Sequence, residues 1–500
     1  MRKDIYSAFG DFMIYGLGAV AMQAVSILLI PVYTRWLGVA DYGVLSLLMG
    51  IQFMLVPLAQ AGMGSALFRS YYDYNDEAGH RGVINTAFWL LLPASLGVGA
   101  IAYLLAGAAA GQLARDAIEV RHLQWIALIT FAEGLGILPF SVFRARRQAV
   151  RFMTTTILTL LVRLGAIIWM VVVLRSGLMG VLHGMFIGAV AGVAGGYLQL
   201  GRTLTWMFNR GDAARLLRFG LPLIPINVAF WVLAVSGRYI LARHVTMEQV
   251  GLYALAERLA NVLNVVLVQP LGLLWLPVML SVSRQEHARR FYSRMFSYFM
   301  MAGVFASLCL ALVVPEVLPL LAPPSFFPAA PFVFPLCLGF VAFGASRILN
   351  VGTDLARTPE RYLVALTIAC AVFLVGCSLL IPRWAVWGLV GVTIAASTLF
   401  SGLVFWFGNQ QYRVRFDWTR VAVIVAAGVL CYVLAQAGSG LVAAAGWRWG
   451  IKLAAAVAYP VILLASGVVQ PEERAELARQ WAALRARTRG GRDVAERNAP

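Results

Sequence analysis

Charged side chains are scarce in this 500-residue chain: they make up 12% of it, whereas hydrophobic residues make up 61%. The mean hydropathy is +0.80. A soluble protein of this size has too little interior to hide so much apolar surface, so the composition excludes an ordinary fold in water. Apolar runs long enough to cross a bilayer recur from one end to the other. The first run is too long for a cleavable signal peptide.

Cysteine and histidine are also rare, with five residues of each. The cysteines lie in apolar stretches without a CxxC spacing, and the histidines are scattered. We therefore interpret the cysteines as small buried hydrophobic residues, and we expect no disulfide, metal site or cofactor. The chain has no GxxxxGK[ST] loop and no loop long enough for a catalytic domain, so we expect neither direct use of ATP nor an enzyme.

Acidic residues are few, at 22 against 40 Lys and Arg, and the formal net charge is +18. Only Lys3 and Lys452 are lysines. In a soluble chain this excess would suggest nucleic acid. Here the arginines lie in short loops between apolar runs, where they orient helices in the membrane, so we expect no nucleic-acid partner.

The apolar runs predict an all-α, polytopic membrane protein with about fourteen transmembrane helices. The predicted spans are 10–34, 43–66, 82–108, 122–142, 154–174, 178–200, 217–241, 249–279, 293–314, 329–350, 361–381, 385–408, 418–436 and 444–468. With this count, most loop arginines fall on one side, here called the arginine-rich side; the other is the opposite side. The positive-inside rule then predicts that the arginine-rich side and both termini are cytoplasmic.

Short sequence matches recur at a nearly constant spacing. Asp41–Leu47 is matched by Gln249–Leu255, about 208 residues later, and Gly177–Val181 is matched by Gly388–Val392, about 211 residues later. This spacing predicts a duplicated unit of six helices in parallel orientation. The predicted divisions are an N-terminal six-helix lobe at 1–210, a C-terminal six-helix lobe at 211–410, an extra helix pair at 411–469 and an amphipathic or charged cytoplasmic tail at 470–500.

Several charged residues lie inside predicted spans, where each costs about 2.5–3.5 kcal/mol on insertion scales and therefore needs a function or a partner. These residues are Glu133, Arg163, Arg238, Glu257 and Arg258, and Arg347 lies near the cytoplasmic end of its span. Helical spacing places Arg258, Asn261 and Asn264 on one face with Glu257. The same rule places Asn227 on one face with Arg238.

Polar faces on several helices predict a shared, water-accessible cavity. Arginine outnumbers the carboxylates within the spans, which favours an anionic ligand, and its planar fork suits phosphate. The alternative for any one of these residues is structural: a carboxylate neutralises an arginine, or a polar side chain joins two helices. The spacing does not separate these readings.

Three motifs resemble a known family. Arg35–Gly43, which follows the first apolar run, resembles the N-terminal segment of bacterial polysaccharide and O-antigen flippases. Phe219–Pro225 and Gly237–Leu241 resemble the mid-chain motifs of that family. It belongs to the multidrug, oligosaccharidyl-lipid and polysaccharide exporter superfamily. The resemblance extends over about residues 8–410.

The resemblance implies a V-shaped pair of six-helix lobes around a cationic cavity. It implies transport of undecaprenyl-diphosphate-linked oligosaccharide repeat units between the leaflets of the bacterial inner membrane by alternating access, for O-antigen, capsule or exopolysaccharide synthesis. Arg238 lies within the matching motif and is expected to receive the diphosphate. Besides membrane lipids, the expected partners are a polysaccharide polymerase and a chain-length regulator. The predicted substrate-binding residues are Arg163, Asn227, Arg238, Arg258, Asn261, Asn264 and Arg347.

A proton or sodium gradient is expected to drive the return step, with Glu133 or Glu257 as the carrier. The nearest alternative function is a cation-coupled drug antiporter of the same superfamily, for which we expect a more acidic cavity. A flippase for peptidoglycan precursors, a membrane glycosyltransferase or polymerase, and a scaffold without transport activity are further alternatives. The lack of a large extracytoplasmic loop argues against the enzymes.

Overall fold

All the secondary structure in the described residues is helical, as the composition predicted. The computed structural model describes residues 28–113, 117–442 and 445–468. Twelve helices in these ranges are long and apolar enough to cross a membrane. The chain is therefore an all-α, multi-pass membrane protein. The predicted tail at 470–500 lies outside the described residues.

The first half of the chain forms α2 (Val39–Gln60), α3 (Met63–Tyr71), α4 (Glu77–Leu113), α5 (Val120–Ala145), α6 (Ala149–Ile168) and α7 (Gly177–Leu200). The second half forms α8 (Arg210–Gly220), α9 (Leu223–Trp231), α10 (Gly237–Ala242), α11 (Met247–Leu263), α12 (Gln269–Val282), α13 (Ala288–Leu321), α14 (Ala330–Leu349), α15 (Val351–Ala356), α16 (Pro359–Gln411), α17 (Trp418–Leu441) and α18 (Ala445–Ala465). The π-helical turns η1 (Trp169–Val173), η3 (Val232–Ser236) and η4 (Asn264–Val268) continue α6, α9 and α11.

Helix α16 covers two predicted spans, the eleventh and the twelfth. Its 53 residues would be about 80 Å long if straight, far more than a bilayer requires. The backbone reverses at Ala385, where φ is 49°, and Arg361 Nη1 near one end donates to Gln410 Oε1 near the other at 3.1 Å. The first predicted span, 10–34, lies mostly outside the described residues, so the count of fourteen stays a prediction.

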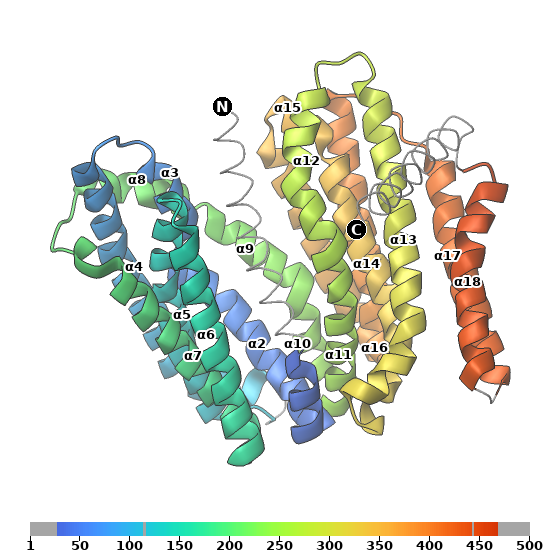
Figure 1. Ribbon diagram of the computed structural model, residues 1–500, viewed down its shortest axis with the longest axis horizontal. Coiled ribbons are helices and arrows are strands. Elements are labelled where there is room, and N and C mark those ends of the chain that lie inside the picture. The colour runs from blue at the N-terminus through green and yellow to red at the C-terminus, as the bar shows by residue number, and fades with distance from the viewer. Residues whose placement is uncertain (1–27, 114–116, 443–444, 469–500) are drawn as a thin grey trace, which may run out of the picture.

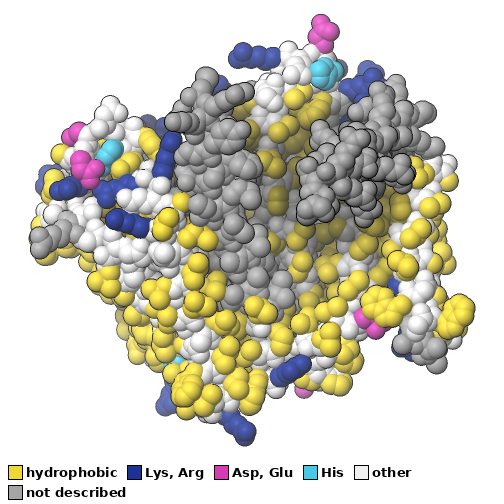
Figure 2. Space-filling model, viewed as in Figure 1, with side chains coloured by type: hydrophobic (Ala, Val, Ile, Leu, Met, Phe, Trp, Pro, Cys, Tyr) yellow, Lys and Arg dark blue, Asp and Glu magenta, His cyan; other side chains and the backbone are white. Residues whose placement is uncertain are grey.

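The helices form a V (Figure 1). Helices α4–α7 lie on one side and α11–α16 on the other, with α2, α9 and α10 between them. The first bundle is defined here as α4–α7 together with α2, and the second bundle as α11–α16 together with α9 and α10. The two bundles diverge toward the end that carries α3, α8 and α15 and converge at the other end. Because the sequence places arginine clusters in and beside α3, α8 and α15, the V opens on the arginine-rich side. Among the side chains that Figure 2 colours by type, hydrophobic ones predominate between the two ends of the molecule, and most Lys, Arg, Asp and Glu side chains lie toward those ends.

Two pairs of backbone turns recur at the spacing of the predicted repeat. Arg147, after α5, has a φ of 54°, and Arg357, after α15, has a φ of 56°. Arg175, before α7, and Ala385, inside α16, both have a φ of 49°. A positive φ is unfavourable for a residue with a side chain, and these two pairs recur at a spacing of about 210 residues. Turns that the predicted repeat makes equivalent therefore share an unusual conformation.

The extra helix pair packs on the outside of the second bundle. Lys452 Nζ of α18 donates to Glu316 Oε1 of α13 at 2.7 Å. The ring of Tyr432 in α17 stacks on that of Phe334 in α14, with centroids 4.2 Å apart. Figure 1 shows α17 and α18 at the edge of the molecule, away from the first bundle.

The bundles meet closely where α2 crosses α11. A Cβ on Gly43 would lie 2.2 Å from Met247 O, and one on Gly251 would lie 2.1 Å from Val39 O. Since Gly43 and Gly251 are equivalent residues of the predicted repeat, each copy supplies a glycine to the same crossing. The two backbones touch because neither position has a side chain.

This crossing predicts that Gly43→Ala and Gly251→Ala each destabilise the protein by about 1–3 kcal/mol, because the added methyl group meets backbone rather than a movable side chain. The measurement is the thermal unfolding of purified protein in lipid nanodiscs. Gly165→Ala is the matched control: the site is helical with open space around it, and the change should stabilise slightly. Equal melting temperatures for all three variants would contradict the close crossing.

Candidate functional site

Helix α2 accepts three hydrogen bonds from the segment that follows α8. Trp231 Nε1 donates to Gly50 O at 2.7 Å, and Tyr239 Oη donates to Leu47 O at 2.6 Å. Arg238 Nη1 donates to Ser46 O at 3.4 Å. These carbonyls lie within about one turn of α2, so α9 and α10 are held along one short stretch of the first bundle.

Arg238 is also paired within the second bundle. Its Nε donates to Glu257 Oε2 at 2.8 Å, and its Nη2 lies 2.5 Å from the same oxygen. The two side chains are only 18% and 14% exposed. The structure thus brings together two predicted site residues, one predicted to bind substrate and the other to couple an ion, as a nearly buried ion pair.

A second pair lies in the first bundle. Arg163 Nη2 of α6 contacts Glu133 Oε1 of α5, and Gln52 Nε2 of α2 donates to Glu133 Oε2 at 2.8 Å. These arginine and glutamate side chains are 30% and 23% exposed. Arg163 Nε is buried and has no hydrogen-bond partner among the described residues. Each bundle therefore carries one arginine–glutamate pair in contact with α2.

The predicted polar face of α11 is present. Asn264 Nδ2 donates to Asn261 Oδ1 at 3.1 Å, and both side chains are partly exposed. The guanidinium carbon of Arg258 lies 5.6 Å from the centre of the Tyr33 ring, a cation–π distance. Arg258 is partly exposed and Tyr33 is buried. This face carries one cation and two amides.

Two predicted residues lie apart from these clusters. Asn227 is exposed on α9, and Arg347 is exposed in the last turn of α14, on the arginine-rich side. Sequence reasoning missed Gln52 and Tyr239. Gln52 is a lone amide in an apolar run, which is a signal that could have identified it; Tyr239 lies beside Arg238 and gave no separate signal.

The opposite side is closed by contacts between Thr34 and Arg35, at the end of the first described helical segment, and the second bundle. Thr34 Oγ1 donates to Leu321 O at 2.6 Å, and Arg35 Nη2 donates to Leu320 O at 2.9 Å. Arg243 Nη2, after α10, donates to a carbonyl at the end of α4 at 3.3 Å. These bonds join the bundles where the V converges.

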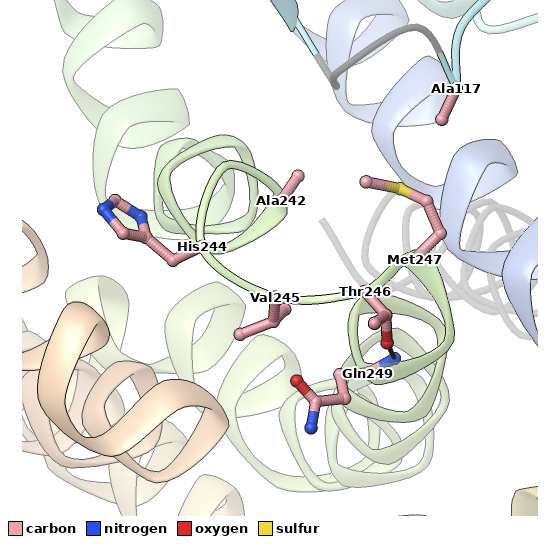
Figure 3. Close-up of a pocket in the computed structure, with 7 residues that line it drawn as sticks. All are labelled: Ala117, Ala242, His244, Val245, Thr246, Met247 and Gln249. Carbon is pink, nitrogen blue, oxygen red and sulfur yellow. Dashed lines mark hydrogen bonds between the residues drawn. The ribbon is translucent and has the colours of Figure 1, made fainter.

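A hollow of about 450 Å³ lies on this closed side, at the turn between α10 and α11 (Figure 3). Its lining residues are Ala117, Ala242, His244, Val245, Thr246, Met247 and Gln249. Thr246 Oγ1 accepts from Gln249 N at 3.5 Å and caps α11. None of the seven is a predicted site residue, so this hollow belongs to the junction of the bundles rather than to the polar faces.

All five cysteines are free; four are buried and Cys309 is partly exposed. Within residues 28–113, 117–442 and 445–468, no three His, Cys, Asp or Glu side chains gather in a way that could hold a metal ion. The expectation that the protein needs no cofactor stays a prediction.

The sequence between residues 32 and 331 matches the family described as "Polysaccharide biosynthesis protein". No curated protein matches the chain. A solved structure titled "Lipid II flippase MurJ, inward closed conformation" is similar, with a TM-score of 0.71 and 8% identity over 92% of this chain and 98% of that one.

Two MATE transporters share the fold more distantly. An inward-facing multidrug resistance MATE family transporter of the MOP superfamily has a TM-score of 0.63 and 13% identity, over 82% of this chain and 98% of that one. A single-residue mutant of the Vibrio cholerae MATE transporter VcmN has a TM-score of 0.57 and 13% identity, over 81% of this chain and 96% of that one. At such low identities these likenesses establish the fold alone.

The Arg238–Glu257 pair predicts strongly non-additive mutations. Glu257→Ala should destabilise the protein by roughly 3–5 kcal/mol because it leaves a nearly buried guanidinium without its carboxylate, whereas the double variant Arg238→Met/Glu257→Leu should lie close to wild type. The measurement is thermal or denaturant unfolding of the purified variants. Arg81→Ala, which breaks an exposed pair with Glu77, is the control and should cost less than about 1 kcal/mol. Additive losses in the double variant would contradict this account.

Proposed function

Because the chain belongs to the family of polysaccharide biosynthesis proteins, we propose that it is a lipid-linked oligosaccharide flippase. It moves undecaprenyl-diphosphate-linked repeat units from the cytoplasmic to the periplasmic leaflet of the bacterial inner membrane, for O-antigen, capsule or exopolysaccharide synthesis. The arginine-rich side and both termini lie in the cytoplasm. A polysaccharide polymerase and a chain-length regulator act next to it on the transported units.

The observation that carries this proposal is the direction in which the V opens. The bundles diverge on the arginine-rich side, and hydrogen bonds from Thr34, Arg35 and Arg243 join them on the opposite side. A substrate that starts in the cytoplasmic leaflet needs such an arrangement, because its polar head must enter from the cytoplasm while its polyprenyl chain stays in lipid. We therefore interpret this arrangement as the loading state of the proposed alternating-access cycle.

The polar face of α11 is the proposed contact surface for the head of the substrate. Arg258 supplies a cation to the diphosphate, and the amides of Asn261 and Asn264 supply donors and acceptors to sugar hydroxyls. Asn227 on α9 and Arg347 on α14 lie apart from this face, and we propose that they contact the substrate separately. The buried Nε of Arg163 makes no hydrogen bond among the described residues, so an anion that displaces Glu133 can accept from it.

The two ion pairs suggest how transport is coupled to an ion gradient. Arg238 and Arg163 are each neutralised by a carboxylate, so an arriving diphosphate competes with Glu257 and Glu133 for the guanidinium groups. A carboxylate that loses its arginine in a poorly hydrated site is stabilised by taking up a proton or a sodium ion. Substrate binding and ion uptake are thereby linked, and release of the ion accompanies the return.

A cation-coupled drug antiporter is the alternative, because MATE transporters have the same fold. A cationic drug needs an available carboxylate. Glu133 and Glu257 already face arginine, so neither carboxylate is available to a cationic drug. The proposed activity is transport, without a chemical step on the sugar.

The test of this function is the sidedness of the lipid-linked glycan in cells with and without the protein. A membrane-impermeant oxidant labels only periplasmic sugars. Loss of the protein should leave intact repeat units shielded in the cytoplasmic leaflet. If they still reach the periplasm in a strain without redundant flippases, the flippase function is wrong, and drug export is the activity to measure.

Arg258→Ala should reduce glycan export roughly ten- to a hundredfold, because a charge-assisted hydrogen bond to the diphosphate contributes about 1.5–3 kcal/mol. Arg383→Ala, at an exposed arginine on the opposite side, is the control and should export normally. Both variants must be inserted at wild-type abundance, measured by immunoblot of membranes. Normal export by Arg258→Ala would contradict the role of α11.

A further inference from the structure

The connection between α7 and α8 exposes three consecutive apolar side chains. Trp206 is 89% exposed, Met207 is 47% exposed and Phe208 is 52% exposed. The segment around them, Gly201–Asn209, begins with the single 3-10 turn η2 (Gly201–Thr203) and is otherwise non-helical. Exposed apolar residues are expected on lipid-facing helices, whereas here they occupy a loop.

Polar side chains of α4 hold the backbone of this loop. Asn85 Nδ2 donates to Thr203 O at 3.0 Å, and Thr205 N donates to Asn85 Oδ1 at 2.5 Å. Asn209 N donates to Thr86 Oγ1 at 3.0 Å. Asn85 and Thr86 are fully buried. Two polar residues inside an apolar helix thus supply hydrogen-bond partners to the backbone of the loop.

The attachment points lie well below the start of α4. Asn85 is about 12 Å, and Trp89 about 18 Å, along the helix from its first residue, Glu77. The loop therefore descends beside the apolar part of α4. Non-helical backbone at this depth must find its hydrogen-bond partners in the protein, because lipid offers none. Asn85 and Thr86 provide them.

The apolar tip is ordered in advance and flanked by cations. The Trp206 ring stacks on the Trp89 ring with centroids 4.5 Å apart, and Trp89 Nε1 donates to Thr205 O at 3.3 Å. Arg151, which donates to Gln199 O at 3.5 Å at the end of α7, and Arg210, at the start of α8, are both exposed. Tryptophan and arginine are typical of the boundary between acyl chains and anionic headgroups.

We propose that Gly201–Asn209 is a lipid anchor, which inserts Trp206, Met207 and Phe208 among the acyl chains of the leaflet on the arginine-rich side. The exposed arginines at its two ends meet the phosphates of that leaflet. The anchor also fixes α8, which leads into the segment that crosses between the bundles. This inference does not depend on the transported substrate.

The test is the depth of a spin label at Met207→Cys in the full-length protein, with the five native cysteines replaced, in vesicles that contain phosphatidylglycerol. Collisions with oxygen should exceed collisions with a water-soluble nickel chelate, as for a label at Leu104→Cys, which is 80% exposed on α4. A label at Asn75→Cys, exposed in the α3–α4 connection, should show the reverse.

A Met207 label that behaves like the Asn75 label would overturn the anchor. A label shielded from both reagents would also overturn it, since the tip would then face another protein. Asn85→Leu provides a second measurement. Without the hydrogen bonds from Asn85 to Thr203 and Thr205, the label at Met207 should be more mobile and more accessible to nickel. An unchanged depth and mobility in that variant would contradict the role of the α4 side chains.

Discussion

Within a bilayer, every polar group must find its partner inside the protein, and this constraint shapes each part of the structure. It makes the described secondary structure helical, because only a helix satisfies its own backbone. It also explains the polar residues that interrupt the apolar spans. Asn85 and Thr86 support a loop, and Glu133 and Glu257 neutralise arginines. Polar side chains in the spans thus mark the places where the protein departs from simple helix packing.

Helix α2 is the element on which this constraint acts most strongly. It packs against α4 and α5 on one side and against α9 and α11 on the other. Its carbonyls at Ser46, Leu47 and Gly50 accept from the second bundle, while Gln52 donates to the ion pair of the first. If the bundles rock relative to one another, these bonds must be exchanged for others rather than lost, because an unpaired polar group costs about 1–3 kcal/mol.

The sequence was sufficient to predict the fold but not to predict which arginine pairs with which glutamate. Apolar runs predicted the helices, and arginine loops predicted which side is cytoplasmic, since both depend on composition along one segment; the side on which the V opens came from the structure. The family resemblance was confirmed over residues 32–331. Helical spacing also found the shared face of Asn261 and Asn264. It allowed a carboxylate to neutralise an arginine but could not pair Arg163 with Glu133, because the contact joins two successive helices and only packing decides which of their faces meet.

The two arginine–glutamate pairs change the conclusion drawn from the excess of arginine in the spans. Arg163 and Arg238 do not add positive charge to the space between the bundles, because each faces a carboxylate. Two arginines without carboxylate partners would bind a diphosphate tightly whichever leaflet the site faces. Tight binding in every state opposes release. In the proposed cycle, an arginine alternates between a carboxylate and the substrate, and its charge stays balanced at each step. The affinity of this arginine for the anion then depends on the difference in binding free energy between the carboxylate and the substrate. That difference is small enough for a conformational change to change its sign.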